Sequence, residues 1–269
     1  MYVTHYGLAE APFNITPDPR FLFFSDQHRE AFDHLYFGIR ERKGFIQITG
    51  EVGAGKTTLC RALLAQLGPS FHTALILNPV LTGSQLLRAV LTELGVKAQR
   101  DRGLMLEQLN EFLLEQHHAG HEVVLLIDEA QDLSDELLEQ LRLLSNFETD
   151  DRKLLQIVLV GQPELRDKLD RRNLRQLRQR ITVRFHLGSL DLADTRRYVE
   201  HRLHVAGANG RPTFTAWAMR AVHRYSGGVP RLVNAVCDKA LLCGYVAGVD
   251  ELRYRDVRRA VKELEGNLR

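Results

Sequence analysis

The sequence predicts an α/β fold, in which a mostly parallel sheet of five strands lies between helices and is followed by a small all-helical domain. Three observations support this prediction. Apolar strand-like runs alternate with helical patterns up to residue 187, a glycine-rich loop joins the first such run to a helix, and beyond residue 187 only helical patterns continue. Alternation of this kind is typical of parallel sheets, because a parallel connection needs a crossover helix.

The expected strands are short apolar runs bounded by polar or turn residues. They cover residues 45–49, 73–77, 123–128, 154–160 and 181–186. The helices expected between them have apolar residues at three- and four-residue spacing. They cover residues 57–67, 83–94, 103–118 and 134–147, the last with Ser134 as its N-cap. Four more helical patterns follow, at residues 192–205, 213–225, 229–246 and 255–264.

The glycine-rich loop matches the phosphate-binding pattern G-x-x-x-x-G-K-S/T, and it stands between the first strand and a helix, where that chemistry requires it. Backbone N–H groups of such a loop surround the β-phosphate, Lys56 neutralises phosphate charge, and the Thr57 hydroxyl can ligate Mg²⁺. We therefore expect ATP and Mg²⁺ as cofactors. The expected nucleotide-binding residues are Gly50, Glu51, Val52, Gly53, Ala54, Gly55, Lys56, Thr57 and Thr58.

An acidic pair follows the most apolar of the expected strands, residues 123–127. Five consecutive apolar residues suit a central parallel strand that is covered on both faces, and ligands bind at the carboxyl ends of such strands. We expect Asp128 to be the carboxylate on the metal side and Glu129 to be the general base. An acidic pair after a strand is common in ordinary proteins. The assignment of Asp128 and Glu129 is convincing only because the sequence also contains a phosphate loop.

Composition agrees with an enzyme of this kind. The chain has 269 residues, of which 44% are hydrophobic and 26% charged, enough for one α/β domain and a smaller one. Its net charge of +2 gives no global reason to expect nucleic acid or an anionic membrane as a partner. The spacing of Cys60, Cys237 and Cys243 indicates free thiols, and no apolar stretch or signal pattern suggests a membrane span or secretion. We expect a soluble, cytoplasmic protein.

A helical domain that follows a phosphate-loop domain narrows the class of NTPase to the AAA+ ATPases. Membership of this superfamily implies further functional residues at set positions. The segment ending in Arg231 resembles sensor 2 of this superfamily, which implies a contact with the γ-phosphate; the alternative is a surface arginine after a Gly-Pro turn. Gln162 occupies the place of sensor 1 at the end of the fourth strand. Asn78 is a candidate for switching the catalytic glutamate, although it also suits a turn before a proline, and Asn146 is its rival.

A basic segment, residues 171–180, precedes the last strand. AAA+ rings place the arginine finger here, which reaches the ATP of the neighbouring subunit and stabilises charge during phosphoryl transfer. Arg180 stands in the best register and Arg178 is the runner-up. The alternatives are a solvated basic helix face and a patch that contacts DNA phosphates.

The amino-terminal segment narrows the resemblance to one family. Its motifs lie at residues 6–8, 11–13, 17–23 and 28–31, and further matches follow at residues 50–58, 126–131, 141–149, 154–165 and 227–234. Together they resemble the ExeA/GspA ATPases of type II secretion and their relatives in pilus biogenesis and exopolysaccharide export. The longer ExeA continues into a membrane-spanning helix and a periplasmic peptidoglycan-binding module, which this sequence does not contain.

The resemblance implies a domain plan and a function. Residues 1–43 would be a linker and first helix bordering the nucleotide pocket, with Ile15 and His28 as contacts; residues 44–188 would be the AAA+ nucleotide-binding domain and residues 189–269 the helical lid. The chain would be an oligomeric, ring-forming or dimeric ATPase that drives or regulates assembly of an envelope export machine, at the inner-membrane face through a partner or a further region.

Two other classes compete with this function. A DNA-associated AAA+ regulator of the MuB/TniB transposition type is disfavoured by the near-neutral charge and by the lack of an appended helix-turn-helix pattern. A nucleotide-gated binding module with little turnover would not need Glu129 beside Asp128.

Overall fold

The computed structural model describes residues 1–14, 18–149 and 152–266. These residues form two compact units, which are described separately below. The α/β unit consists of residues 29–50 and 59–187. The helical unit consists of residues 1–28, 51–58 and 188–269. Judged by its contacts, the phosphate loop therefore belongs to the helical unit. The domain boundaries expected after residues 43 and 188 stay a prediction.

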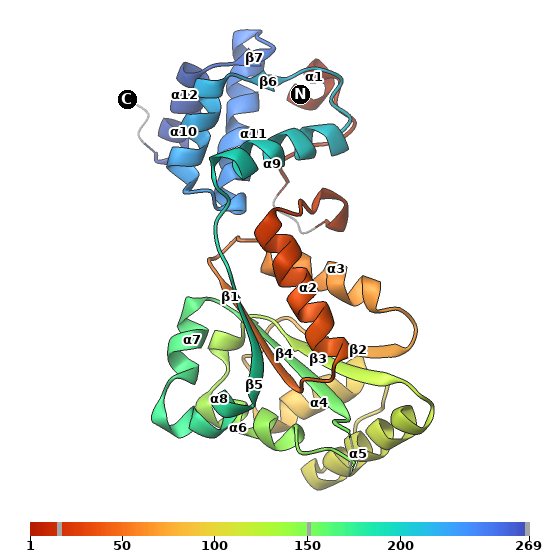
Figure 1. Ribbon diagram of the computed structural model, residues 1–269. Coiled ribbons are helices and arrows are strands. Elements are labelled where there is room, and N and C mark those ends of the chain that lie inside the picture. Colours follow the sequence, from red (N-terminus) through yellow and green to blue (C-terminus); the bar gives the residue numbers. More distant parts are fainter. Residues whose placement is uncertain (15–17, 150–151, 267–269) are drawn as a thin grey trace. The chain divides into compact units, whose positions relative to one another are not determined.

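A five-stranded sheet forms the centre of the α/β unit (Figure 1). The strand order is β2-β3-β4-β1-β5, and every neighbouring pair is parallel, which confirms the predicted sheet. All carboxyl ends therefore lie at one edge, and the ends of β3 and β4 are direct neighbours there. The strands are β1 (Phe45–Gly50), β2 (Phe71–Ile76), β3 (Glu122–Ile127), β4 (Leu155–Gly161) and β5 (Ile181–Leu187).

Burial explains the sequence pattern of the strands. Every residue of β1 and β4 is buried, and in β3 only the first is not, as expected for parallel strands covered on both faces. The outermost strands β2 and β5 are less buried, and in β5 the exposed and half-buried side chains alternate along the strand. A bulge near Phe45 adjusts the register between β1 and β5.

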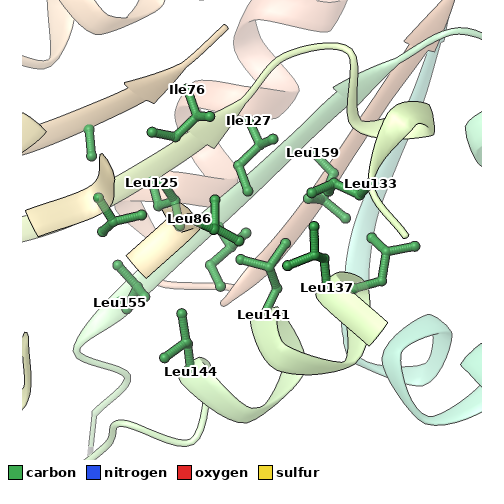
Figure 2. Close-up of a cluster of buried hydrophobic side chains, with 14 of the residues drawn as sticks. Ile76, Leu86, Leu125, Ile127, Leu133, Leu137, Leu141, Leu144, Leu155 and Leu159 are labelled. Carbon is green, nitrogen blue, oxygen red and sulfur yellow. The ribbon is translucent and has the colours of Figure 1, made fainter. Parts of the chain in front are cut away.

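The helices of the α/β unit supply the apolar side chains that cover the sheet. Figure 2 shows the leucines of α6, with Leu86 of α4, against the apolar residues of β2, β3 and β4. Ser134 caps α6 as predicted, since its Oγ accepts a hydrogen bond from Leu137 N at 3.2 Å. The helices are α2 (Asp26–Arg40), α3 (Lys56–Leu67), α4 (Gly83–Glu93), α5 (Arg102–His118), α6 (Asp135–Leu144), α7 (Pro163–Leu169) and α8 (Arg175–Arg180), with the 3-10 turns η2 (Ala130–Asp132) and η3 (Arg172–Leu174).

Between β4 and β5 the structure has more helix than the sequence pattern indicates. Two short helices and a 3-10 turn, α7, η3 and α8, occupy a region for which only a basic segment was expected. Each is too short for a clear apolar period, and each contributes one or two leucines to the core: Leu165, Leu169, Leu174 and Leu177.

The helical unit contains the four predicted helices, α9 (Leu192–Val205), α10 (Ala216–Ser226), α11 (Pro230–Ala247) and α12 (Tyr254–Leu264). Contrary to the expectation of an all-helical domain, it also has a pair of two-residue strands, β6 (Thr213–Phe214) and β7 (Glu251–Leu252). The helix expected from residue 213 begins later, because Thr215 is its N-cap and accepts from Ala218 N at 3.3 Å.

The amino-terminal segment is part of the core of the helical unit. It contains α1 (Tyr2–Tyr6) and η1 (Pro19–Phe21). Tyr6 and Phe13 are 1% and 2% exposed and belong to the apolar cluster formed by α9, α10, α11 and α12. The buried Arg202 of α9 binds the segment through a 3.1 Å hydrogen bond to Asn14 O. Ile15, an expected pocket contact, lies outside the described residues.

Within the described ranges, no helix combines the length and the apolar composition that crossing a bilayer requires.

Candidate nucleotide site

The phosphate loop directly follows β1 and leads into the first turn of α3. Gly53 and Gly55 adopt φ angles of 82° and 95°, which residues with side chains rarely adopt. Lys56 is 6% exposed, and its Nζ donates a 3.0 Å hydrogen bond to Glu51 O, so the lysine folds back across the loop. The result is a closed loop of backbone groups with a buried cation, followed by the half-buried Thr57 and Thr58 at a helix N-terminus.

His28 fixes the loop from α2. Its Nε2 lies 3.1 Å from Ala54 O, and its Nδ1 lies 2.7 Å from Ser25 Oγ. A carbonyl oxygen only accepts, so Nε2 carries the proton and the neutral ring accepts from the serine hydroxyl at Nδ1. Burial lowers the pKa of His28, an effect that the bond to Ala54 and the carboxylate of Asp194 oppose in part. The sequence pointed to His28 as a pocket contact; the structure places it on the phosphate loop.

We expect acidification to destabilise this arrangement, because protonation at Nδ1 charges a buried ring and removes the acceptor of the Ser25 hydroxyl, while Nε2 still donates to Ala54 O. The pKa of His28 is lower in the folded protein than its ordinary value of 6.5. The neutral ring therefore contributes its full stabilisation of the fold above pH 6.5, and this stabilisation is lost as the pH falls through the lowered pKa. The free energy of unfolding, measured between about pH 8 and 5, should therefore fall on the acid side, and in His28→Gln, whose amide can still donate to Ala54 O, it should fall less. His34→Gln, at an exposed position of the same helix, is the control and should follow the wild type. Identical pH profiles for all three proteins would contradict the assignment.

Arg231 also contacts the loop. It is the second residue of α11, and its backbone N–H donates to Gly53 O at 3.2 Å. A Cβ on Gly53 would stand 2.3 Å from the Cβ of Arg231, so only glycine permits this approach. The expected lid arginine thus lies against the phosphate loop, and its role toward a γ-phosphate stays a prediction.

At the end of β3, the structure brings the acidic pair together with two glutamine side chains. Asp128 is 4% exposed, and its Oδ1 accepts from Glu129 N at 2.9 Å. Glu129 has a φ of 51°, one of the two positive φ values found in non-glycine residues within the described ranges. This rarely populated conformation turns the chain sharply after the strand and is typical of functional sites.

Two amide groups hold the carboxylate of Glu129. Gln131 Nε2 donates to Glu129 Oε2 at 2.8 Å, and Gln162 Nε2 donates to the same oxygen at 3.2 Å. Gln131 Oε1 in turn accepts from Gln162 N at 3.0 Å, which connects the two glutamines. A Cβ on Gly161 would lie 2.9 Å from Gln131 Oε1, so the glycine that ends β4 makes room for this contact. We call these three side chains the Glu129 clamp.

Sequence reasoning expected Gln162 at this place but missed Gln131. The only signal for Gln131 was its position in the motif at residues 126–131. Asn78, proposed as the switch residue, is exposed, and its Oδ1 accepts from Val80 N at 3.3 Å, which is the turn geometry considered as its alternative. Its rival Asn146 is also exposed, after the end of α6. In the described structure, the side-chain donors to Glu129 are the two glutamines.

The two candidate finger arginines have different surroundings. Arg180 is half-buried and binds its own chain, since Nη1 donates to Ser145 Oγ at 2.6 Å and to Arg142 O at 3.2 Å. Arg178 is half-exposed and makes an ion pair of 3.1 Å with the similarly exposed Asp170. Surface pairs of this kind contribute little stability, so Arg178 can change its partner at small cost.

Comparisons with known proteins agree with this geometry. The AAA domain family matches residues 39–169. General secretion pathway protein A of Aeromonas hydrophila is 47% identical over 268 residues, which are 99% of this chain and 49% of that protein. The chain belongs to the AAA+ ATPases of the ExeA/GspA type. It spans about half the length of this relative.

Solved AAA+ structures share the fold. The ORC2 protein of Aeropyrum pernix, in its ADPNP–ADP complexes, has a TM-score of 0.68 and 20% identity over 94% of this chain and 71% of its own. Drosophila ORC bound to DNA has a TM-score of 0.71 and 18% identity over 94% of this chain and 64% of its own. At these identities the likeness shows the fold alone.

Proposed function

We propose that this AAA+ ATPase domain binds Mg-ATP on its phosphate loop and hydrolyses it with Glu129 as the general base. The observation that carries the proposal is the Glu129 clamp, which holds a carboxylate in a set orientation at the carboxyl edge of the sheet, directly after the buried Asp128. Both hydrogen bonds of the clamp fall on Oε2, so Oε1 is the oxygen that would take the proton of the attacking water.

The residues present suit ATP and Mg²⁺. The loop offers closely spaced backbone N–H groups and the buried ammonium of Lys56, which suit phosphate oxygens. Thr57 and Asp128 would hold Mg²⁺, which prefers hard oxygen ligands. Bound Mg²⁺ would neutralise charge on the phosphates. Arg231, whose backbone already contacts the loop, would add positive charge to the γ-phosphate, and Gln162 would orient the water together with Glu129.

The proposal for the biological process is supported by the relative. The name of general secretion pathway protein A, which is 47% identical to this chain, supports a role in secretion. We propose that ATP turnover drives or regulates the assembly of an envelope secretion, pilus or polysaccharide export machine from the cytoplasmic face of the inner membrane, and that the working form is a homo-oligomer. A gel shift of DNA at micromolar protein that falls with salt would instead support the DNA-associated alternative.

Subunit mixing tests the oligomer. Arg180→Ala and Arg178→Ala subunits keep their own nucleotide loops, and Lys56→Ala subunits keep their arginines. If one of these arginines acts on a neighbour's ATP, turnover should rise more than linearly with protein concentration, and mixing the inactive finger variant with Lys56→Ala should restore part of the activity.

The variants need a control from the same basic segment. Arg171→Ala removes an exposed arginine whose contact with Asp135 is 3.5 Å long, and it should leave turnover unchanged. Because Arg180 also binds Ser145 and Arg142 O, loss of activity in Arg180→Ala counts only if its thermal unfolding matches that of the wild type. Activity proportional to concentration, without rescue in either mixture, would show a monomeric enzyme.

A further inference from the structure

A groove lies on the surface of the helical unit, between α10 and the beginning of α12. Its volume is about 760 Å³, within the range of ligand and peptide pockets. Trp217, Arg220 and Arg224 stand three and four residues apart on one face of α10, and Arg253 and Tyr254 line the groove from the beginning of α12. None of these five residues belongs to the nucleotide site. We call this feature the α10–α12 groove.

Two aromatic rings are unusually exposed in the groove. Trp217 is 67% exposed and Tyr254 is 52% exposed, while the neighbouring Met219 and Val222 of α10 are buried in the core. Aromatic residues at such exposed positions are typical of interaction sites, because they bury a large apolar area with little loss of side-chain entropy. The guanidinium carbon of Arg220 lies 4.7 Å from the centroid of the Trp217 ring, a cation–π contact that orders both side chains.

The charge of the groove is positive and poorly compensated. Helix α10 contains no aspartate or glutamate. Within the described residues, no ion pair joins Arg220 or Arg224 to a carboxylate, and Arg253 pairs only with Glu251, at 3.3 Å and with both side chains more than half exposed. Such a pair is weak. Three guanidinium groups around one concave apolar surface are complementary to carboxylates on a partner.

We propose that the α10–α12 groove is a docking site for an acidic peptide segment of another protein. An aromatic or large aliphatic side chain of the segment would lie between Trp217 and Tyr254, and flanking aspartates or glutamates would bind Arg220, Arg224 and Arg253. A peptide fits better than nucleic acid, because the cations surround one apolar concavity and the chain as a whole carries a net charge of only +2.

Trp217 itself reports on binding, since it is the only tryptophan of the chain. The probe is a synthetic peptide with one phenylalanine between pairs of glutamates, added to the full chain with and without ATP. We expect a blue shift of the emission of Trp217, as its exposed ring becomes covered, with a dissociation constant on the order of 10–100 μM that weakens with salt. The same peptide with lysines in place of glutamates should bind at least about tenfold more weakly.

Charge-reversal variants distinguish binding in the α10–α12 groove from nonspecific electrostatic attraction to the protein. Arg220→Glu and Arg224→Glu should each weaken binding about tenfold or more, because they place a like charge beside the glutamates. Arg196→Glu is the control, since it reverses an exposed arginine on α9, which pairs there with Glu200; its affinity should equal that of the wild type. A labelled peptide followed by anisotropy confirms the affinities independently of Trp217.

Three results would overturn the proposal: no acidic-peptide binding at ~1 mM by either measurement, equal binding of the lysine peptide, or tighter binding of a single-stranded oligonucleotide, which would identify a nucleic-acid site instead. The groove residues lie outside the nucleotide site, so this proposal does not depend on the proposed ATP hydrolysis. The groove variants should therefore keep wild-type nucleotide affinity.

Discussion

Glu129→Gln should bind ATP almost as well as the wild type and hydrolyse it at least about a hundredfold more slowly. The substitution replaces the carboxylate by an amide of the same shape, which can no longer accept a proton from water. Binding depends on the phosphate loop, which the change leaves intact. Phosphate release under saturating ATP measures the loss of turnover, and a fluorescent ATP analogue measures the retained affinity.

Gln131→Ala is the matched variant for this experiment. It removes the 2.8 Å hydrogen bond to Glu129 but leaves the carboxylate in place. If Gln131 only orients the base, turnover should change much less than in Glu129→Gln, by about tenfold or less, again with unchanged ATP affinity. Wild-type turnover in Glu129→Gln would mean that another residue is the base and that the clamp serves a structural purpose.

Lys56→Ala should lose ATP binding, with an affinity at least about a hundredfold weaker than that of the wild type. The 6% exposed ammonium is the buried cation of the phosphate loop, and its Nζ also bonds to Glu51 O, so the change removes both charge and a bond that closes the loop. Equilibrium binding of the fluorescent analogue measures the effect, and thermal unfolding without nucleotide shows whether the variant is folded.

Lys239→Ala serves as its control. Lys239 pairs with Glu263 at 3.1 Å in the helical unit, outside the phosphate loop, and its removal should leave ATP affinity unchanged. A Lys56→Ala protein that is folded and binds ATP with wild-type affinity would refute the assignment of the nucleotide site.

The sequence predicted those parts of the structure that depend on local pattern. The parallel sheet was readable because strands covered on both faces need unbroken apolar runs, such as residues 123–127, and the loop was readable because glycine alone accepts its backbone angles. Gln162 was found because the resemblance to AAA+ ATPases implies a polar residue after the fourth strand, and the structure places it beside Glu129.

What the sequence did not reveal depends on contacts between distant residues. Gln131 reaches Glu129 only because Glu129 has a φ of 51° and because Gly161 leaves space on the neighbouring strand, and neither condition has a local pattern. The amino-terminal segment is similar: Tyr6 and Phe13 show no periodicity that would assign them to the core of the helical unit. The turn role of Asn78 is local, since its Oδ1 accepts from Val80 N, whereas a switch role depends on whether the distant Glu129 lies within reach of its side chain.

The two bonds that hold the phosphate loop have a consequence for ligand affinity. His28 binds the carbonyl of Ala54, and Arg231 N–H binds the carbonyl of Gly53. In a trans peptide the N–H points opposite to the carbonyl, so the bond to Ala54 O directs the N–H of Gly55 away from His28. The N–H of Ala54 donates to Glu51 O at 3.1 Å, which fixes the peptide that Arg231 binds on its carbonyl side. The orientation of these backbone dipoles is thus set in advance, and an anion that binds them would not have to offset the full entropy of ordering the loop. Residues such as Ser25, which orient His28 without contacting the loop, would then tune nucleotide affinity from a distance.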